Sequence, residues 1–243
     1  MTQAIFITAR LKSTRLPGKA LIKVNKKPLI GYMIDRLNLN SDNPIYICTS
    51  TNVQDDPLED LAKELSVECY RGSEEDVLQR YLDCAQHFSI DSMYITYADE
   101  PFVDIDLLKK SFEQMQTKEK IWIRNDDYLD GTFGYGFTFE GLQLVNNLKT
   151  TDENEVWGEM VSRMPLTTIK NESPYKFSKQ NIRLTVDYPE DLEVFKILIK
   201  YLEGRSSDVS VPEIVRIYQE NDLFRINGFR SSDYNKRIEE QSV

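Results

Sequence analysis

The sequence predicts an α/β fold, a mostly parallel sheet with helices on both faces. Short apolar runs rich in β-branched residues alternate with longer segments whose apolar residues recur at helical spacing. Hydrophobic residues make up 40% of the 243-residue chain, which is enough to bury a core in one large domain. We therefore expect a single domain over residues 1–243.

The alternation is clearest in the first half of the chain. The run 3–9 is apolar, contains Ile5 and Ile7, and is flanked by polar residues, which is typical of a buried strand. From residue 77 the apolar side chains recur three and four residues apart, which indicates a helix over 77–88. By these criteria we expect strands over 3–9, 44–49, 67–70, 92–97 and 182–186, and helices over 29–37, 56–65, 77–88, 105–115, 189–201 and 211–221.

The middle of the chain departs from this alternation. Residues 122–170 are rich in aromatic residues and glycine, as in the run GTFGYGFTFEG, and include a polar stretch at 149–155. This composition predicts an inserted arm between strands of the main sheet, and arms of this kind often pair subunits. We therefore expect a homodimer joined through the arm. The polar residues from about 232 to 243 are expected to form a loose tail.

Composition disfavours several classes of protein. The formal net charge of −10 argues against a nucleic-acid partner, because such binding is driven by neutralising phosphates. No apolar run approaches the ~18 residues of a membrane span, and the short apolar start of the chain does not resemble a secretory signal. Three cysteines without a CxxC motif are typical of a reducing compartment, so a cytoplasmic location is expected.

A basic loop follows the first predicted strand. Its residues 10–19 carry four cations, Arg10, Lys12, Arg15 and Lys19. Ligands of a parallel α/β sheet bind beyond the carboxyl ends of its strands, where this loop is expected. Arg offers bidentate contacts to phosphate oxygens and Lys a mobile charge, so the loop could cradle a triphosphate. It is not a Walker A loop, because an alanine follows Lys19 where a Ser or Thr would bind magnesium. The alternative is a solvated basic loop without a ligand.

Two carboxylates stand at the ends of predicted strands. Asp99 follows the fourth strand and Asp187 the fifth. Strand ends at one edge of a sheet can converge on one point, and Mg²⁺ typically takes one or two carboxylates plus substrate phosphates. Asp187 also has a structural explanation. An aspartate followed by Pro189 and Glu190 is typical of a helix N-cap. One Asp can both cap a helix and face a metal ion.

Four segments, in order, resemble one family of enzymes. ARLKSTRLPGKAL begins at Ala9, RGSEEDVLQRY at Arg71, YADEPFVDIDLL at Tyr97 and LTVDYPEDLEVF at Leu184. Together they resemble the cytidylyltransferases that include CMP-Kdo synthetase, and more closely the relatives named as spore-coat polysaccharide biosynthesis proteins. The likeness extends from residue 1 to about residue 200, and four ordered motifs are more specific than any one alone.

The resemblance implies a Rossmann-like nucleotidyltransferase fold and a usually dimeric, Mg²⁺-dependent enzyme that transfers CMP from CTP and releases pyrophosphate. It implies catalytic roles for Arg15, Lys19 and Asp99, and magnesium ligation by Asp99 and Asp187. The basic loop would hold the triphosphate, and the segment that begins at Arg71 would approach the nucleoside. The nucleotide-binding residues implied in this way are Ala9, Arg10, Ser13, Arg15, Lys19, Arg71, Ser73, Asp76 and Arg80.

The acceptor is left open where the sequence departs from the family. Tyr97-Ala98-Asp99 stands where the sugar-acid enzymes usually have Gln-Gly-Asp or Thr-Gly-Asp, and 153–155 is Glu-Asn-Glu where the spore-coat-like relatives tend to have Arg-Glu-His. We expect a small acidic acceptor, a Kdo- or nonulosonate-like sugar acid for surface glycan synthesis. A phosphate or phosphonate acceptor is the closest alternative. A nucleotide-binding protein without turnover is less favoured, because both predicted metal ligands are present.

Overall fold

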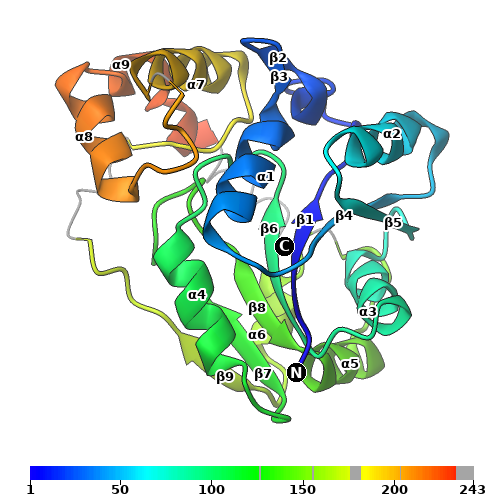
Figure 1. Cartoon of the computed structure of the whole chain (residues 1–243). Coiled ribbons are helices and arrows are strands. Elements are labelled where there is room, and N and C mark those ends of the chain that lie inside the picture. The colour runs from blue at the N-terminus through cyan, green and yellow to red at the C-terminus, as the bar shows by residue number, and fades with distance from the viewer. Residues whose placement is uncertain (126, 155, 176–181, 203, 234–243) are drawn as a thin grey trace.

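A seven-stranded sheet forms the centre of the protein (Figure 1). The computed structural model describes residues 1–125, 127–154, 156–175, 182–202 and 204–233. The strand order is β5-β4-β1-β6-β8-β7-β9, and within this sheet β8 alone runs antiparallel to its neighbours. The predicted, mostly parallel sheet is confirmed. Its strands are β1 (Gln3–Thr8), β4 (Ile45–Ser50), β5 (Glu68–Gly72), β6 (Ser92–Tyr97), β7 (Ile121–Arg124), β8 (Tyr135–Thr138) and β9 (Thr167–Lys170).

The strand β1 lies inside the sheet, between β4 and β6, because its side chains are apolar on both faces. Residues 4–7 have no exposed surface, which is typical of a parallel strand covered on both sides. Ile5 lies opposite Ile45 of β4 and opposite Tyr94 of β6. The carboxyl end of β1 therefore opens into the basic loop between two flanking strands.

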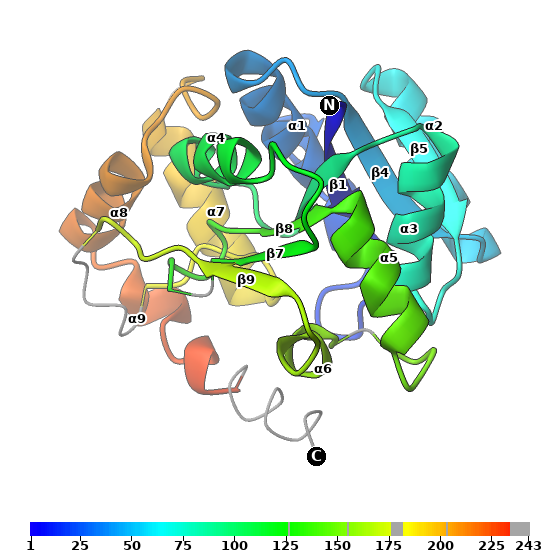
Figure 2. The same cartoon turned by 90° about the horizontal axis from the view of Figure 1, so that it is seen from below.

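Helices cover both faces of the sheet, as predicted (Figure 2). Ile5 and Ile7 point to one face and Phe6 to the other, because successive side chains of a strand alternate. One apolar run thus supplies two cores. The first face is covered by α1 (Leu29–Asn40), α2 (Asp56–Glu64) and α4 (Ile105–Gln114), and the second by α3 (Val77–His87), α5 (Phe139–Leu148) and α6 (Gly158–Ser162).

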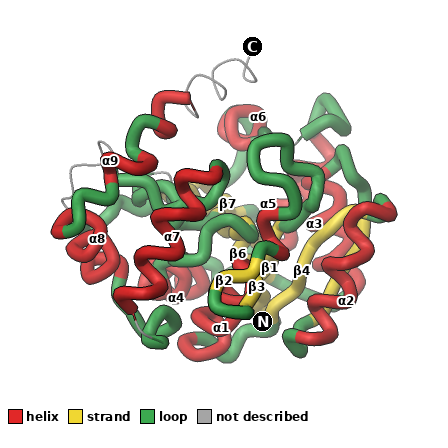
Figure 3. The backbone as a smooth tube through the Cα atoms, turned by 90° about the horizontal axis from the view of Figure 1, so that it is seen from above, coloured by secondary structure: helices red, strands yellow, loops and turns green. Residues whose placement is uncertain are grey.

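A third group of helices lies at the end of the sheet where β1 runs into the basic loop (Figure 3). It shares an apolar cluster with Leu16 of that loop and with Tyr32 of α1. The predicted helices 189–201 and 211–221 are confirmed as two of its members. The group consists of α7 (Pro189–Leu202), α8 (Val211–Glu220) and α9 (Phe224–Asn227), beside a hairpin of β2 (Lys23–Val24) and β3 (Lys27–Pro28).

The segment 122–170 belongs to the sheet, which corrects the expectation of an inserted arm. It supplies β7, β8 and β9, and its helix α5 packs on the same face as α3. The buried side chains of Trp122 and Phe137 explain its aromatic content. A Cβ on Gly134 would lie 2.3 Å from the carbonyl oxygen of Ile95, so glycine is needed where the chain enters β8 beside β6. Pairing of subunits through this segment stays a prediction.

Residues 182–186 are buried but do not form the predicted strand. The backbone N–H of Leu184 donates to the carbonyl of Asp130 at 3.1 Å, and that of Val186 donates to the carbonyl of Asp99 at 2.8 Å. These two bonds reach two different loops, so they do not make the regular ladder of a sheet. The second bond brings the two segments that carry the predicted magnesium ligands side by side.

The end of the chain is described only in part. The predicted loose tail from about 232 to 243 lies almost entirely outside the described residues, the last of which is residue 233. Within the ranges that the structure covers, no helix combines the length and the apolar character needed to cross a membrane.

Candidate active site

The basic loop is held in place by its backbone and by one buried side chain. Leu11 N–H donates to Asp55 Oδ1 at 2.8 Å, and Gly18 N–H donates to the carbonyl of Leu11 at 3.3 Å. Gly18 has a φ of 64°, a left-handed conformation that favours glycine at this turn. Leu16 is buried in the apolar cluster that it shares with the third group of helices, α7 to α9. These anchors fix the loop so that two of its cations face the carboxylates of distant segments.

Asp99 and Asp187 converge on one lysine, although the three residues lie far apart in the sequence. Lys19 Nζ donates to Asp99 Oδ2 and, at 2.7 Å, to Asp187 Oδ1. Arg15 Nη2 donates to the same Asp187 oxygen at 2.6 Å. The structure thus brings together the four residues that the resemblance implies for catalysis and metal binding.

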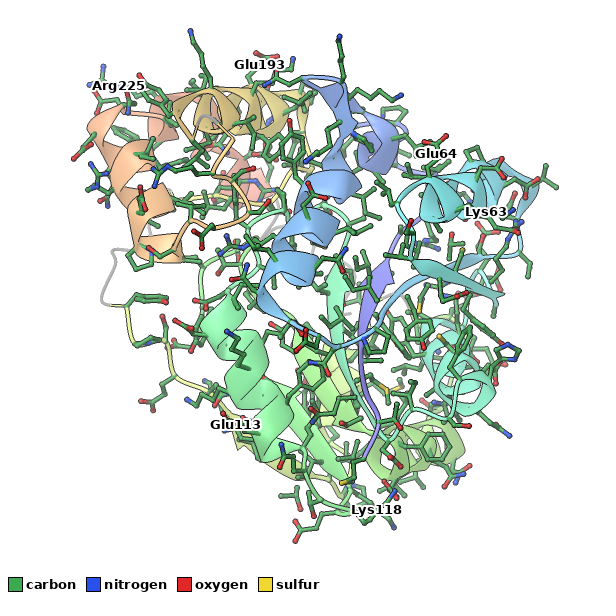
Figure 4. All side chains as sticks on the ribbon, viewed as in Figure 1. Lys63, Glu64, Glu113, Lys118, Glu193 and Arg225 are labelled. Carbon is green, nitrogen blue, oxygen red and sulfur yellow. The ribbon has the colours of Figure 1, made fainter. Side chains whose placement is uncertain are left out.

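These charges are largely enclosed by the protein. The side chain of Lys19 is 14% exposed and that of Asp187 is 4% exposed. Charged side chains elsewhere, such as Lys63, Glu113 and Arg225, project outward from the periphery (Figure 4). Enclosed charges interact more strongly than solvated ones, because water screens them less.

A buried ion-pair network, which was not predicted from the sequence, binds the second carboxylate oxygen of Asp187. Arg183 has no exposed surface, and its Nη2 donates to Asp187 Oδ2 at 3.0 Å. Arg183 Nε donates to Asp191 Oδ1 at 3.0 Å, and Asn227 Nδ2 donates to the same oxygen at 2.9 Å. The sequence feature that could have predicted this network is an arginine inside an apolar run, with aspartates four and eight residues later. We call Arg15, Lys19, Asp99, Arg183, Asp187 and Asp191 the carboxylate cluster.

The carboxylate of Asp187 accepts from the side chains of Arg15, Lys19 and Arg183. Asp191, in the first turn of α7, bonds the backbone that precedes this helix. Its Oδ2 accepts from the N–H groups of Asp187 and Tyr188, each at 3.0 Å. Glu190 pairs instead with Arg230 at 2.9 Å. The carboxylate of Asp187 is therefore directed to the cations and not to the helix backbone.

The cluster settles the charge state of its members. Burial raises the pKa of Asp187, but the cations around it, Lys19 first, outweigh burial and bring it down to about 2. Burial and the charge of Asp187 raise the pKa of Asp99 above its ordinary value in spite of Lys19. Burial lowers the pKa of Lys19, but the two aspartates raise it by more. The lysine therefore remains an ammonium ion between two acids.

An aromatic ring borders the cluster. Tyr188 lies beneath three guanidinium groups, at 5.2 Å from Arg15, 5.6 Å from Arg183 and 4.6 Å from Arg230, measured to the ring centroid. Such contacts stabilise the cations and limit the positions they can take. Tyr188 thus couples the basic loop to the residues that follow α9.

Four of the remaining predicted nucleotide-binding residues form a second group near the start of α3. Asp76 caps this helix by accepting from Gln79 N–H at 3.0 Å, and it also bonds Lys149 and Asn154. Arg71 turns away toward the start of α2, where it pairs with Asp56 at 2.6 Å. We call Arg71, Ser73, Asp76 and Arg80 the α3 cluster.

Arg80 is the member of this cluster with unused donors. It has no exposed surface, and its Nη1 donates to the carbonyl of Ser73 at 2.7 Å. Its Nε and Nη2 are buried without a hydrogen-bond partner among the described residues. A buried guanidinium with two unmet donors is costly, so it calls for an explanation beyond packing.

The two groups meet through the first residues of the basic loop. Arg10 Nη1 donates to the carbonyl of Glu74 at 3.1 Å, next to Ser73. Ala9 is buried at the end of β1, and its N–H donates to the carbonyl of Cys48 at 3.3 Å. Ser13 Oγ accepts from the backbone within its own loop. The predicted residues therefore lie along one edge of the sheet, in two groups with different partners.

The two convergent carboxylates suit a magnesium ion whose remaining coordination positions would be filled in part by phosphate oxygens of a ligand. Among the described residues, no three His, Cys, Asp or Glu side chains gather into a metal site made by the protein alone. Mg²⁺ prefers hard oxygen ligands and commonly takes one or two carboxylates plus substrate phosphates. Asp99 and Asp187 offer that donor set, so these two residues could hold the ion.

The chain is similar in sequence and in fold to known cytidylyltransferases. A sequence profile of the cytidylyltransferase family matches residues 4–234. The spore coat polysaccharide biosynthesis protein SpsF of Bacillus subtilis is 28% identical over 232 residues, which cover 91% of this chain and 96% of SpsF. A cytidylyltransferase from Leptospira borgpetersenii superposes with a TM-score of 0.84 at 26% identity, over 93% of this chain and 98% of the other.

A more distant structure has the same fold. It is a CMP-2-keto-3-deoxy-manno-octonic acid synthetase complexed with CTP, which superposes with a TM-score of 0.58 at 16% identity and covers 83% of this chain and 99% of its own. At this identity the likeness concerns the fold alone. The family profile spans nearly the whole chain, and the relatives match over most of their length. The protein therefore belongs to the cytidylyltransferase family of nucleotidyltransferase enzymes.

Proposed function

We propose that the protein transfers CMP from CTP to a small acidic sugar of the Kdo or nonulosonate type, with release of pyrophosphate, for surface glycan synthesis. The observation that carries the proposal is the convergence of Asp99 and Asp187 on Lys19 and Arg15. Membership of the cytidylyltransferase family supports the choice of nucleotide. The pathway class is supported by a relative that is named for spore coat polysaccharide biosynthesis.

Mg²⁺ is the proposed cofactor, held by Asp99 and Asp187. When bound, it would supply positive charge to the triphosphate and offset the charge that develops as pyrophosphate leaves. Arg183 would keep Asp187 ionised and oriented, because its guanidinium is fixed between Asp187 and Asp191.

The residues of the basic loop would then stabilise the transferring group. The acceptor oxygen attacks the α-phosphorus of CTP in line, and the bond to pyrophosphate breaks. Arg15 and Lys19, which bond carboxylates in this structure, would turn to phosphate oxygens and donate to them. His87 lies on α3 against Phe88, with 4.6 Å between ring centroids, and takes no part. Catalysis would rest on positioning and charge stabilisation.

We also propose that the protein is a cytoplasmic homodimer. The support for a dimer is the family resemblance, together with the exposed strand β9 at one end of the sheet order, where main-chain groups could pair with a second copy. The support for the cytoplasm is that all three cysteines are free.

The test measures pyrophosphate release with CTP, ATP, GTP and UTP across sugar acids, phosphosugars and phosphonates. CTP with Mg²⁺ and a sugar acid is expected to give the fastest release. It is also expected to raise the melting temperature most, because specific binding stabilises the folded state by mass action. Equal thermal shifts for the four nucleotides would contradict the choice of CTP. Turnover only with phosphosugars or phosphonates would replace the proposed acceptor and leave the nucleotide unchanged.

A further inference from the structure

We propose that Lys19 occupies the metal position in the nucleotide-free protein, so that the divalent cation and the nucleotide enter the site as a coupled pair. The proposal relies on the proposed function for the identity of the nucleotide, and adds to it an order of events. It starts from one ammonium group that lies between two carboxylates of distant segments.

The ammonium group uses the same oxygens that a shared metal ion would use. Lys19 Nζ is 2.7 Å from Asp187 Oδ1 and contacts Asp99 Oδ2 directly. An ion bound to both oxygens at about 2.0–2.1 Å would overlap the ammonium position. Two cations cannot share so small a space between two oxygens. Lys19 must therefore leave before a metal ion takes both carboxylates.

The charges of the carboxylate cluster also disfavour a metal ion that arrives alone. Its three carboxylates face three cationic side chains within a largely buried site. A dication added without an anion would leave uncompensated positive charge there, which is costly in a low-dielectric environment. A triphosphate brings the negative charge that offsets the metal ion. Metal and nucleotide should therefore stabilise each other in the site.

Lys19 is better able to move than Arg183. Arg183 has no exposed surface and is bonded to both Asp187 and Asp191, so it is fixed. Lys19 has a flexible four-carbon stem and a single compact charge. It also stands on the loop that is predicted to bind the triphosphate. A phosphate oxygen would give its ammonium group a new partner, and its departure would free both carboxylates. By linkage, each ligand then raises the affinity for the other.

Binding of Mn²⁺ in the absence of nucleotide tests this inference without any turnover. Mn²⁺ serves as the probe for the divalent site, and the electron paramagnetic resonance signal of the free ion reports how much is bound. Lys19→Met and Lys19→Gln remove the competing charge, and we expect each to bind Mn²⁺ about tenfold more tightly than the wild type. Lys19→Arg keeps a positive charge and is expected to bind as weakly as the wild type.

A matched control separates this competition from a general change in charge. Lys12 stands on the same loop, and its side chain is 66% exposed and paired with Glu74. Lys12→Met therefore removes the same charge without touching the two carboxylates, and it is expected to leave Mn²⁺ affinity unchanged. Lys19→Gln keeps an amide donor toward the aspartates, so the measurement remains possible if Lys19→Met does not fold.

Several outcomes would overturn the inference. These are equal Mn²⁺ affinity in the wild type and both neutral Lys19 variants, no Mn²⁺ binding in any of them, or tighter binding in Lys12→Met as well. Adding Asp187→Asn to Lys19→Gln should abolish the gain in Mn²⁺ affinity. If the gain survived, the ion would bind elsewhere, and this result would also overturn the inference. Nucleotide turnover is measured separately. The Mn²⁺ effect without CTP turnover would contradict only the proposed function, and CTP turnover without the Mn²⁺ effect would contradict only this inference.

Discussion

The carboxylate cluster and the α3 cluster lie along one edge of the sheet, but their side chains have different partners. In the carboxylate cluster, Lys19 meets aspartates that are 80 and 168 residues away, and neither bond closes a turn or caps a helix. In the α3 cluster, Asp76 caps its own helix, and Arg71 of β5 pairs with Asp56 at the start of α2, 15 residues away. The second set of bonds has a local structural reason, and the first does not.

This difference shows which of the predicted residues have a role beyond the fold. Enclosed ion pairs stabilise a protein little, because their attraction scarcely exceeds the cost of removing the charges from water. A cluster of such pairs at the end of a central strand is therefore better explained by a ligand. Arg80 lies in the α3 cluster, but its two unmet donors, like the carboxylate cluster, are better explained by a ligand than by the fold.

The largest expected effect comes from Asp187→Asn. We expect turnover to fall by about tenfold or more, because an amide is a poorer magnesium ligand and leaves Arg15 and Lys19 with a weaker partner. We also expect the free energy of unfolding to fall by about 3 kcal/mol, because the buried Arg183 loses a charged partner. Steady-state kinetics over a range of Mg²⁺ and urea denaturation measure the two effects.

Asp99→Asn is the matched control for this variant. Asp99 pairs with Lys19, and its pKa is raised instead of lowered, so its charge contributes less to folding. It should therefore lose turnover with a smaller loss of stability. A helix cap tolerates Asn about as well as Asp. Wild-type turnover and stability in Asp187→Asn would thus restore the capping role and remove the distinction between the two clusters.

A smaller effect is expected for Arg80→Met, which sharpens the comparison within the α3 cluster. Methionine fills a similar volume without the two unmet donors, so the free energy of unfolding should change by less than about 1 kcal/mol. If nucleotide binding satisfies those donors, KM for CTP should rise by about tenfold. Asp76→Ala should behave in the opposite way, with a loss of about 3 kcal/mol of stability from the missing cap and the broken pair with the largely buried Lys149, and a smaller rise in KM. Equal changes in KM would remove the distinction.

A further expected effect is a pH dependence of the stability that Asp187 contributes. Its pKa is about 2 in the folded protein, below the ordinary ~3.9 of an unfolded chain. A depressed pKa contributes stability that is complete above the unfolded value and is lost as the pH falls toward the folded value. The stability difference between wild type and Asp187→Asn should therefore be constant above about pH 5 and shrink toward pH 2. Denaturation at several pH values tests this, and a constant difference throughout would contradict it.

Some parts of the molecule follow from local sequence. The sequence predicts the strands β1, β4, β5 and β6 and the helices α1 to α4, because each buries a face whose apolar period lies within a single segment. The residues at the strand ends are recognisable in the same way, because a loop that follows a buried strand must lie at the edge of the sheet. Motif order then points to the cytidylyltransferase family, and the family profile over residues 4–234 agrees.

The tertiary structure decided what depends on contacts between distant segments. The strands β7, β8 and β9 belong to the sheet because β8 pairs antiparallel with both β6 and β7. The apolar period within one segment does not predict such a pairing. Residues 182–186 have the composition of a strand but lack a strand to pair with, so they run as a buried connection. The partners of Asp187 were equally hidden. Whether its carboxylate caps a helix or faces Lys19 depends on where the basic loop lies in space, because the two residues are 168 positions apart.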